Sequence, residues 1–199
     1  SELALAARGY MGVAVSLYDS GELDGAISNY ERALQLFERV SDTSFELMVT
    51  QSLAAVHLER GDIAAARDLA QRALERGRAV GDDHWAAVAQ VVLARVALVE
   101  GRAEDALATA EHAERALSVA GDDLQRGDAL RVIGAAHDAL GRAAESEQSY
   151  RASMALLEHI GDLADLSAVA AEFAQRLRAR GKLEEAFEML ERSHGAVKH

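Results

Sequence analysis

Apolar residues recur along the whole chain with the spacing of one helix face. The pattern is clear in two stretches, which read Leu53, Ala54, His57, Leu58, Gly61 and Leu93, Ala94, Ala97, Leu98, Gly101. Spacings of three and four residues place such positions on one side of a helix. The periodicity therefore predicts helices of about 16 residues that are separated by short turns.

Glycines lie on a regular grid along the chain. The first series is Gly21, Gly61, Gly101, Gly141 and Gly181, and the second, midway, is Gly81, Gly121 and Gly161 with Ser41 in register. Each member of the second series is followed by Asp. Glycine ends a helix without strain, and Asp after it can cap the next one. We therefore expect ten helices in five antiparallel pairs, over 4–20, 24–40, 44–60, 64–80, 84–100, 104–120, 124–140, 144–160, 164–180 and 184–195.

Small residues recur at three places in each 40-residue repeat. The columns are Ala26, Ala66, Ala106, Ser146, Ala186; Ala33, Ala73, Ala113, Ser153, Ser193; and Ala14, Ala54, Ala94, Gly134, Ala174. Small residues at these points let neighbouring helices approach closely. This pattern, with large residues such as Tyr10, Leu17 and Tyr30 between, resembles the tetratricopeptide repeat (TPR) family.

The resemblance implies an all-α protein, a right-handed α-solenoid of five TPR-like antiparallel helix pairs. The period is 40 residues where the family usually has 34, and no proline ends the repeats. This longer variety is similar to TPR regions of bacterial signalling and transcription regulators, including the maltose-regulator type and the peptide-pheromone sensors.

One array spanning 1–199 is the expected organisation. Its repeats cover approximately 4–40, 44–80, 84–120, 124–160 and 164–195. The sequence lacks a starting Met and opens in helix-like sequence, so we expect a fragment of a longer protein.

Composition narrows the classes of function. Without cysteine, the chain forms no disulfide scaffold, zinc finger or thiol nucleophile. No apolar run reaches the length of a membrane span, and no signal peptide is present, so we expect a cytoplasmic protein without membrane contact. The net charge of −12 argues against direct binding of nucleic acid.

The sequence contains no catalytic or cofactor motif. His57 and His137 share a repeat position, which indicates structural histidines. The acidic pairs at 82–83 and 122–123 are explained by helix capping rather than by cation binding. We expect no enzyme, no cofactor and no metal.

In TPR arrays the first helix of each pair lines the concave face. By register, the residues expected there are Met11, Val15, Tyr18, Gln51, Leu58, Val91, Arg95, Leu98, Arg131, Gln175 and Arg178. An apolar groove with arginines at one end suits a peptide that carries a carboxylate. The alternative is that Arg178 pairs with Asp138 and that the apolar residues pack against one another. The residues of the groove do not supply the Lys/Asn clamp of chaperone-binding TPRs, so that partner class is rejected.

The expected function is a non-catalytic scaffold that binds a protein or peptide. The second hypothesis is an effector-sensing segment of a larger bacterial transcription or signalling regulator. A helix-turn-helix or P-loop domain upstream of Ser1 would favour the regulator.

The last helix carries more apolar residues than one packing face needs. We expect Phe187 and Leu190 to be covered by a second copy of the chain or by a neighbouring domain, with a possible homodimer through this helix. The alternative is a monomer whose last helix turns these residues inward.

Overall fold

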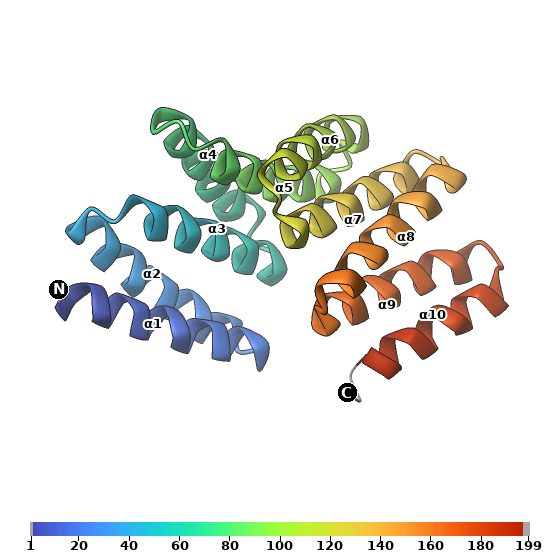
Figure 1. The fold of residues 1–199 in the computed structure, drawn as a ribbon, viewed down its shortest axis with the longest axis horizontal. Helices are drawn as coiled ribbons and strands as arrows, with labels where there is room; N and C mark the ends of the chain where they lie inside the picture. The colour runs from blue at the N-terminus through green and yellow to red at the C-terminus, as the bar shows by residue number, and fades with distance from the viewer. Residues whose placement is uncertain (1, 197–199) are drawn as a thin grey trace. The chain divides into compact units, whose positions relative to one another are not determined.

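The computed structural model describes residues 2–196, and within them it contains ten α-helices and no strand (Figure 1). The helices are α1 (Glu2–Asp19), α2 (Leu23–Val40), α3 (Thr43–Arg60), α4 (Ile63–Ala79), α5 (Asp83–Val99), α6 (Ala103–Ala120), α7 (Asp123–Ala139), α8 (Ala143–Ile160), α9 (Leu163–Ala179) and α10 (Leu183–Ala196). The all-α prediction and the ten predicted helices are confirmed, and every helix begins and ends within two residues of its expected bounds.

The chain forms two compact units that divide after Val99. Unit 1 contains α1 to α5, and unit 2 contains α6 to α10. Within each unit, every helix packs against the next one along the chain. The expected third pair, α5 and α6, is thus divided between the units. The single array over 1–199 stays a prediction.

The turns between helices follow the glycine grid. All eight grid glycines have positive φ, between 71° and 90°, and Ser41 in the same register has φ 56°. These are left-handed conformations, which glycine adopts without the strain that a Cβ atom brings. Each chain reversal therefore depends on a residue that the sequence pattern identifies.

The aspartates that follow the second glycine series cap the next helix. Their carboxylates accept hydrogen bonds from backbone N–H groups three residues later, which are those of Phe45, Trp85, Gln125 and Asp165. Each bond satisfies one of the N–H groups that a helix start leaves unpaired. The capping role expected for Asp42, Asp82, Asp122 and Asp162 is confirmed.

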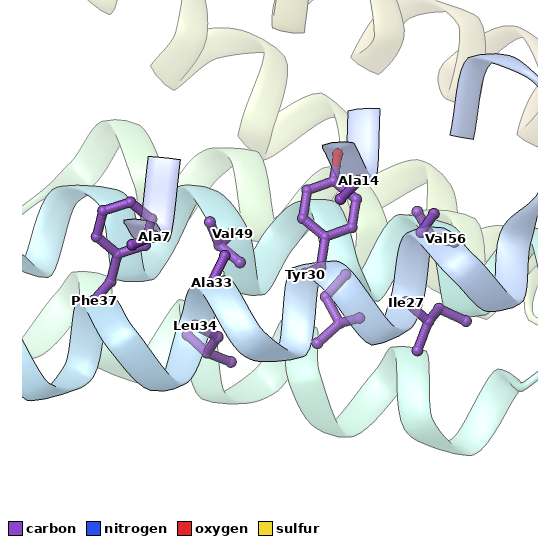
Figure 2. Packing of buried hydrophobic residues seen from close by; sticks show 11 residues of the cluster. Ala7, Ala14, Ile27, Tyr30, Ala33, Leu34, Phe37, Val49 and Val56 are labelled. Carbon is purple, nitrogen blue, oxygen red and sulfur yellow. The ribbon is translucent and has the colours of Figure 1, made fainter. Parts of the chain in front are cut away.

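The three small-residue columns are buried in both units. All described alanine and serine members are at most 5% exposed, and Gly134 is buried as well. The side chain of Ser193 lies outside the described residues. In unit 1, Ala7 and Ala14 of α1 share one apolar cluster with Tyr30 and Phe37 of α2 (Figure 2). Large rings on one helix therefore face small residues on its neighbour.

One of these contacts, at Gly134 in α7, is especially close. A Cβ atom there would lie 2.9 Å from Cδ2 of Tyr150 in α8. The Tyr150 ring is held in place, because it stacks on Phe173 at 5.1 Å and its hydroxyl donates to Glu172 at 2.7 Å. Glycine replaces the column alanine here because the ring leaves no room for a methyl group.

Two buried serines of α8 differ in their hydrogen bonding. Ser153 Oγ donates to the backbone oxygen of Gly127 at 2.7 Å. Ser146 Oγ is buried and has no hydrogen-bond partner among the described residues. A buried hydroxyl without a partner costs free energy, whereas a bonded one contributes to stability.

The two serines therefore predict opposite effects of the same substitution. Ser146→Ala should raise the free energy of unfolding by about 1 kcal/mol, and Ser153→Ala should lower it by about 1 kcal/mol. Both changes add the same helix propensity within one helix, so their difference isolates the hydrogen bond. Urea unfolding measures both, and changes of equal sign and size would contradict this explanation.

The glycines of the helix interiors give a second matched pair. Gly134→Ala forces the ring of Tyr150 to move, which should cost about 1–3 kcal/mol. The higher helix propensity of alanine offsets roughly 1 kcal/mol of this cost, and the net effect should be destabilising. Gly12→Ala in α1 should stabilise it by up to about 1 kcal/mol, because a Cβ there meets nothing within 4 Å. Urea unfolding at low protein concentration distinguishes the two; a stabilised Gly134→Ala would refute the close approach.

Candidate partner-binding surfaces

The predicted partner-binding residues divide between the two units. The unit 1 surface, on α1, α3 and α5, contains Met11, Val15, Tyr18, Gln51, Leu58, Val91, Arg95 and Leu98. The unit 2 surface, on α7 and α9, contains Arg131, Gln175 and Arg178.

Two apolar members of the unit 1 surface are not accessible. Leu58 is 8% exposed and packs with Ala66 and Val96, and Val91 is 1% exposed. The expectation that these two side chains line an open groove is therefore wrong. Helix α5 is apolar on nearly all sides, and such a helix is buried on nearly all sides.

The remaining apolar members and Gln51 are partly accessible. Val15 is 44% exposed, and Met11, Gln51 and Leu98 are half-buried. Met11 also packs against the core of unit 1. A partner would therefore meet a narrower apolar strip than the sequence predicts.

Glu59 connects the polar members of the unit 1 surface. The Tyr18 hydroxyl donates to Glu59 Oε1 at 2.5 Å, and Arg95 Nη2 lies 3.7 Å from the same oxygen. Three helices, α1, α3 and α5, thus meet at one carboxylate. At 3.7 Å the contact to Arg95 is long, so this guanidinium keeps most of its capacity to donate hydrogen bonds.

Arg131 in unit 2 is already bound by two carboxylates of the protein. Its guanidinium donates to Asp128 at 2.6 Å and to Glu172 at 3.2 Å. Asp128 is the main cause that raises the pKa of Arg131, with Glu172 acting the same way and burial opposing it. Burial, and then the charge of Glu172, raises the pKa of Tyr150, whose hydroxyl donates to that carboxylate. Arg131 therefore belongs to an internal network.

Asp138 pairs with other arginines than the one expected. Arg176 Nη1 lies 3.1 Å from its carboxylate, and Arg180 also donates to it. The alternative that Arg178 pairs with Asp138 is therefore wrong. Residues 176 and 180 are one turn apart on the same helix face, whereas Arg178 points elsewhere. Arg178 and Gln175 are exposed, and neither has a hydrogen bond or ion pair among residues 2–196.

Side-chain hydrogen bonds connect the first helices of neighbouring pairs at offsets close to the repeat period. Tyr18 and Glu59 are separated by 41 residues, Arg131 and Glu172 by 41, and Asp138 and Arg180 by 42. The prediction from register placed residues 40 apart side by side, so Glu59 and Glu172 were missed. Opposite charges at an offset of 41 would have identified Glu172, and a hydroxyl and a carboxylate at the same offset would have identified Glu59.

Glu147 of α8 connects the end of α9 to the start of α10. Its carboxylate accepts from Arg180 at 3.3 Å and from Lys182 at 2.9 Å. Burial would raise the pKa of Glu147, but the hydrogen bonds and charges of Lys182 and Arg180 outweigh it, so the pKa is lowered. The charged form of Glu147 therefore stabilises the folded protein.

The last helix exposes apolar side chains. Phe187 is 62% exposed and Leu190 is 40% exposed. Leu183, at the start of the same helix, is 65% exposed. The alternative that α10 turns its large residues inward is therefore wrong for these three.

His57 is buried against its own helix pair. Its Nδ1 lies 3.2 Å from Asp62 Oδ2. Nδ1 of His137, at the same repeat position, is buried without a partner in the described part of the chain. The repeat that contains His137 has Arg142 at the position that Asp62 occupies in the repeat of His57. Among residues 2–196, no three His, Asp or Glu side chains are placed to hold a metal ion.

None of the described helices combines the length and the apolar character needed to cross a membrane.

A family model described as "MalT-like TPR region" matches residues 4–118. No curated protein sequence matches the chain. Among solved structures, a Rap protein complexed with Competence and Sporulation Factor is similar, with a TM-score of 0.86 and 16% identity over 98% of this chain and 54% of that one.

Two further structures share the fold. Aspartyl phosphate phosphatase F from Bacillus subtilis has a TM-score of 0.73 and 16% identity over 99% of this chain and 52% of that one. A putative kinesin light chain from Podosopora anserina with TPR-like repeats has a TM-score of 0.61 and 18% identity, over 95% and 93%. The chain spans about half the length of the Rap protein and of the phosphatase. These similarities confirm the predicted TPR-type helical fold.

The lowered pKa of Glu147 predicts a pH-dependent stability. Glu147→Gln should lower the free energy of unfolding at pH 7 by about 1 kcal/mol or less, the range of partly exposed ion pairs. A depressed carboxylate pKa stabilises above its unfolded value of about 4.3 and loses this effect as the pH falls through the folded pKa. The difference from the wild type should therefore vanish in acid. Urea unfolding across pH measures it, and Glu188→Gln on exposed α10 is the control.

Proposed function

The chain belongs to the family of MalT-like TPR regions, and on that premise we propose that it is a non-catalytic scaffold for a protein or peptide partner. The partner binds along a concave groove lined by the first helices. The observation that carries this proposal is the exposed pair Gln175 and Arg178 on α9, in a unit whose other first-helix arginines are engaged. The Rap protein of similar fold, which was crystallised with Competence and Sporulation Factor, supports a binding role.

The chemistry of the two surfaces suggests the kind of partner. Arg178 offers an uncommitted guanidinium, which binds carboxylates through paired hydrogen bonds. Val15 and the half-buried Met11 and Leu98 offer apolar contact. A peptide with an acidic group fits the unit 2 surface, and a peptide with apolar side chains fits the unit 1 surface. Arg131 is less suited, because binding a partner would require it to leave Asp128 and Glu172.

A second candidate function is effector sensing within a larger bacterial regulator. The family match supports it, because the model describes a region of a longer protein class. A helix-turn-helix or P-loop domain encoded next to this chain would support the regulator, and its absence from the complete coding sequence would argue for the scaffold alone.

We also propose that the protein acts in the cytoplasm and makes no direct contact with nucleic acid or membrane. The net charge of −12 supports the lack of contact with nucleic acid, because such a surface repels phosphate groups. Self-association through Phe187 and Leu190 of α10 likewise stays a proposal, supported by their exposure.

The binding proposal predicts which substitutions weaken a peptide complex. Random peptides displayed on phage are selected on the immobilised protein, and the affinity of the selected peptides is measured by fluorescence anisotropy. Arg178→Ala should weaken the peptides that bind the unit 2 surface, and Val15→Asp those that bind the unit 1 surface, each by about tenfold, equivalent to 1.4 kcal/mol.

Matched controls come from α6, which is the second helix of its expected pair and does not line the proposed groove. Arg115→Ala replaces an exposed arginine of α6, and Val119→Asp replaces a valine of α6 that is 91% exposed. Both should bind the selected peptides as the wild type does. If the controls lose as much affinity as the test variants, or if no peptide is selected, the first-helix groove is not the binding site.

A further inference from the structure

An apolar stripe runs along one side of α10. Leu183, Phe187 and Leu190 are spaced by four and three residues, which places them on one helix face. Their exposed fractions are 65%, 62% and 40%. The buried residues of α10, Ala186 and Met189, lie on the side that packs against α9. The stripe is therefore additional to the face that holds α10 in its own pair.

The repeat shows what covers this stripe in an earlier pair. Four periods earlier, the equivalent residues of α2 are Leu23, Ile27 and Tyr30. Ile27 and Tyr30 are 5% and 4% exposed. They share one cluster with residues that α3 contributes, namely Val49, Leu53 and Val56 (Figure 2). The stripe on α10 therefore has the character of a face that receives the first helix of another pair.

Helix α1 carries the complementary kind of face. Its residues equivalent to Phe45, Val49, Leu53 and Val56 of α3 are Leu5, Gly9, Val13 and Ser16. All four are exposed, with Leu5 at 73% and Val13 at 49%, and none is charged. A Cβ at Gly9 would meet nothing within 4 Å, so this face is flat enough for large side chains to approach.

Charge also favours α1 as the occupant. The exposed side of α10 carries Glu184, Glu188 and Glu191, which would repel an acidic helix. Helix α1 has no acidic residue between Glu2 and Asp19. Its single basic residue in that span, Arg8, lies over the ring of Phe45 at 4.7 Å.

We propose that α10 of one chain receives α1 of a second copy, head to tail, in the way that α2 receives α3. This inference rests on the self-association proposed for α10 and names the helix that α10 binds. Each chain has one face of each kind, so a single contact leaves one α10 face and one α1 face unoccupied. Association through these faces therefore increases as the concentration rises.

A complementation experiment tests the head-to-tail contact. Sedimentation velocity is measured on the 199-residue chain, on Phe187→Glu, on Val13→Glu and on an equimolar mixture of the two variants. The wild type should associate as its concentration rises. Each variant alone should associate at least tenfold more weakly, and the mixture should stop at two chains, because it retains one intact α10 and one intact α1.

Further variants separate unfolding and surface charge from loss of contact. Circular dichroism checks the helix content, with Leu183→Arg and Leu5→Glu as second variants of the two faces. Val119→Glu on α6 should associate as the wild type does. A wild type that stays monomeric at high micromolar concentration overturns self-association altogether. A Val13→Glu variant that still dimerises, or a mixture that stays monomeric, overturns the head-to-tail contact.

Discussion

The close approach of neighbouring helix backbones is the constraint on which the rest of the structure depends. Ala14, Ala54 and Ala94 are completely buried, and Gly134 takes the same place where the Tyr150 ring comes within 2.9 Å of a Cβ position. Protein interiors have little spare volume, so these small residues set how near two helices can lie. The large residues of the second helices then fill the space that remains. This arrangement makes equivalent positions comparable from one repeat to the next.

Local features of this fold could be predicted from the sequence because they depend on neighbouring residues. A glycine with positive φ and an aspartate that caps the next helix act within four or five residues, and the grid at Gly81, Gly121 and Gly161 reveals both. The contacts between helices could not be predicted as well. A 40-residue period identifies which positions are equivalent. Which side chains of two helices touch depends on how far one helix is displaced along the next.

Displacement along the helices and position around each helix explain the errors at the candidate site. Arg131 and Tyr18 contact carboxylates 41 residues later. Asp138 contacts Arg176 and Arg180 at offsets of 38 and 42, whereas Arg178, midway between them in the sequence, lies on another side of the helix. Leu58 was misplaced for a related reason, because its burial depends on Val96 two helices away rather than on its own helix pattern. Both errors concern relations between helices that no single helix encodes.

A regular repeat acquires separate roles through the residues that differ at equivalent positions. Position 27 of the repeat is Ile27 in α2, Glu147 in α8 and Phe187 in α10. Ile27 is buried in the core of unit 1, Glu147 binds Arg180 and Lys182, and Phe187 is exposed. All three residues lie in helices, so the side chain and the helix that packs against it together decide between packing, an ion pair and an open surface. Arg131 and Arg178 differ in the same way, because only the first has carboxylates within reach, and a partner's carboxylate meets less competition at the second.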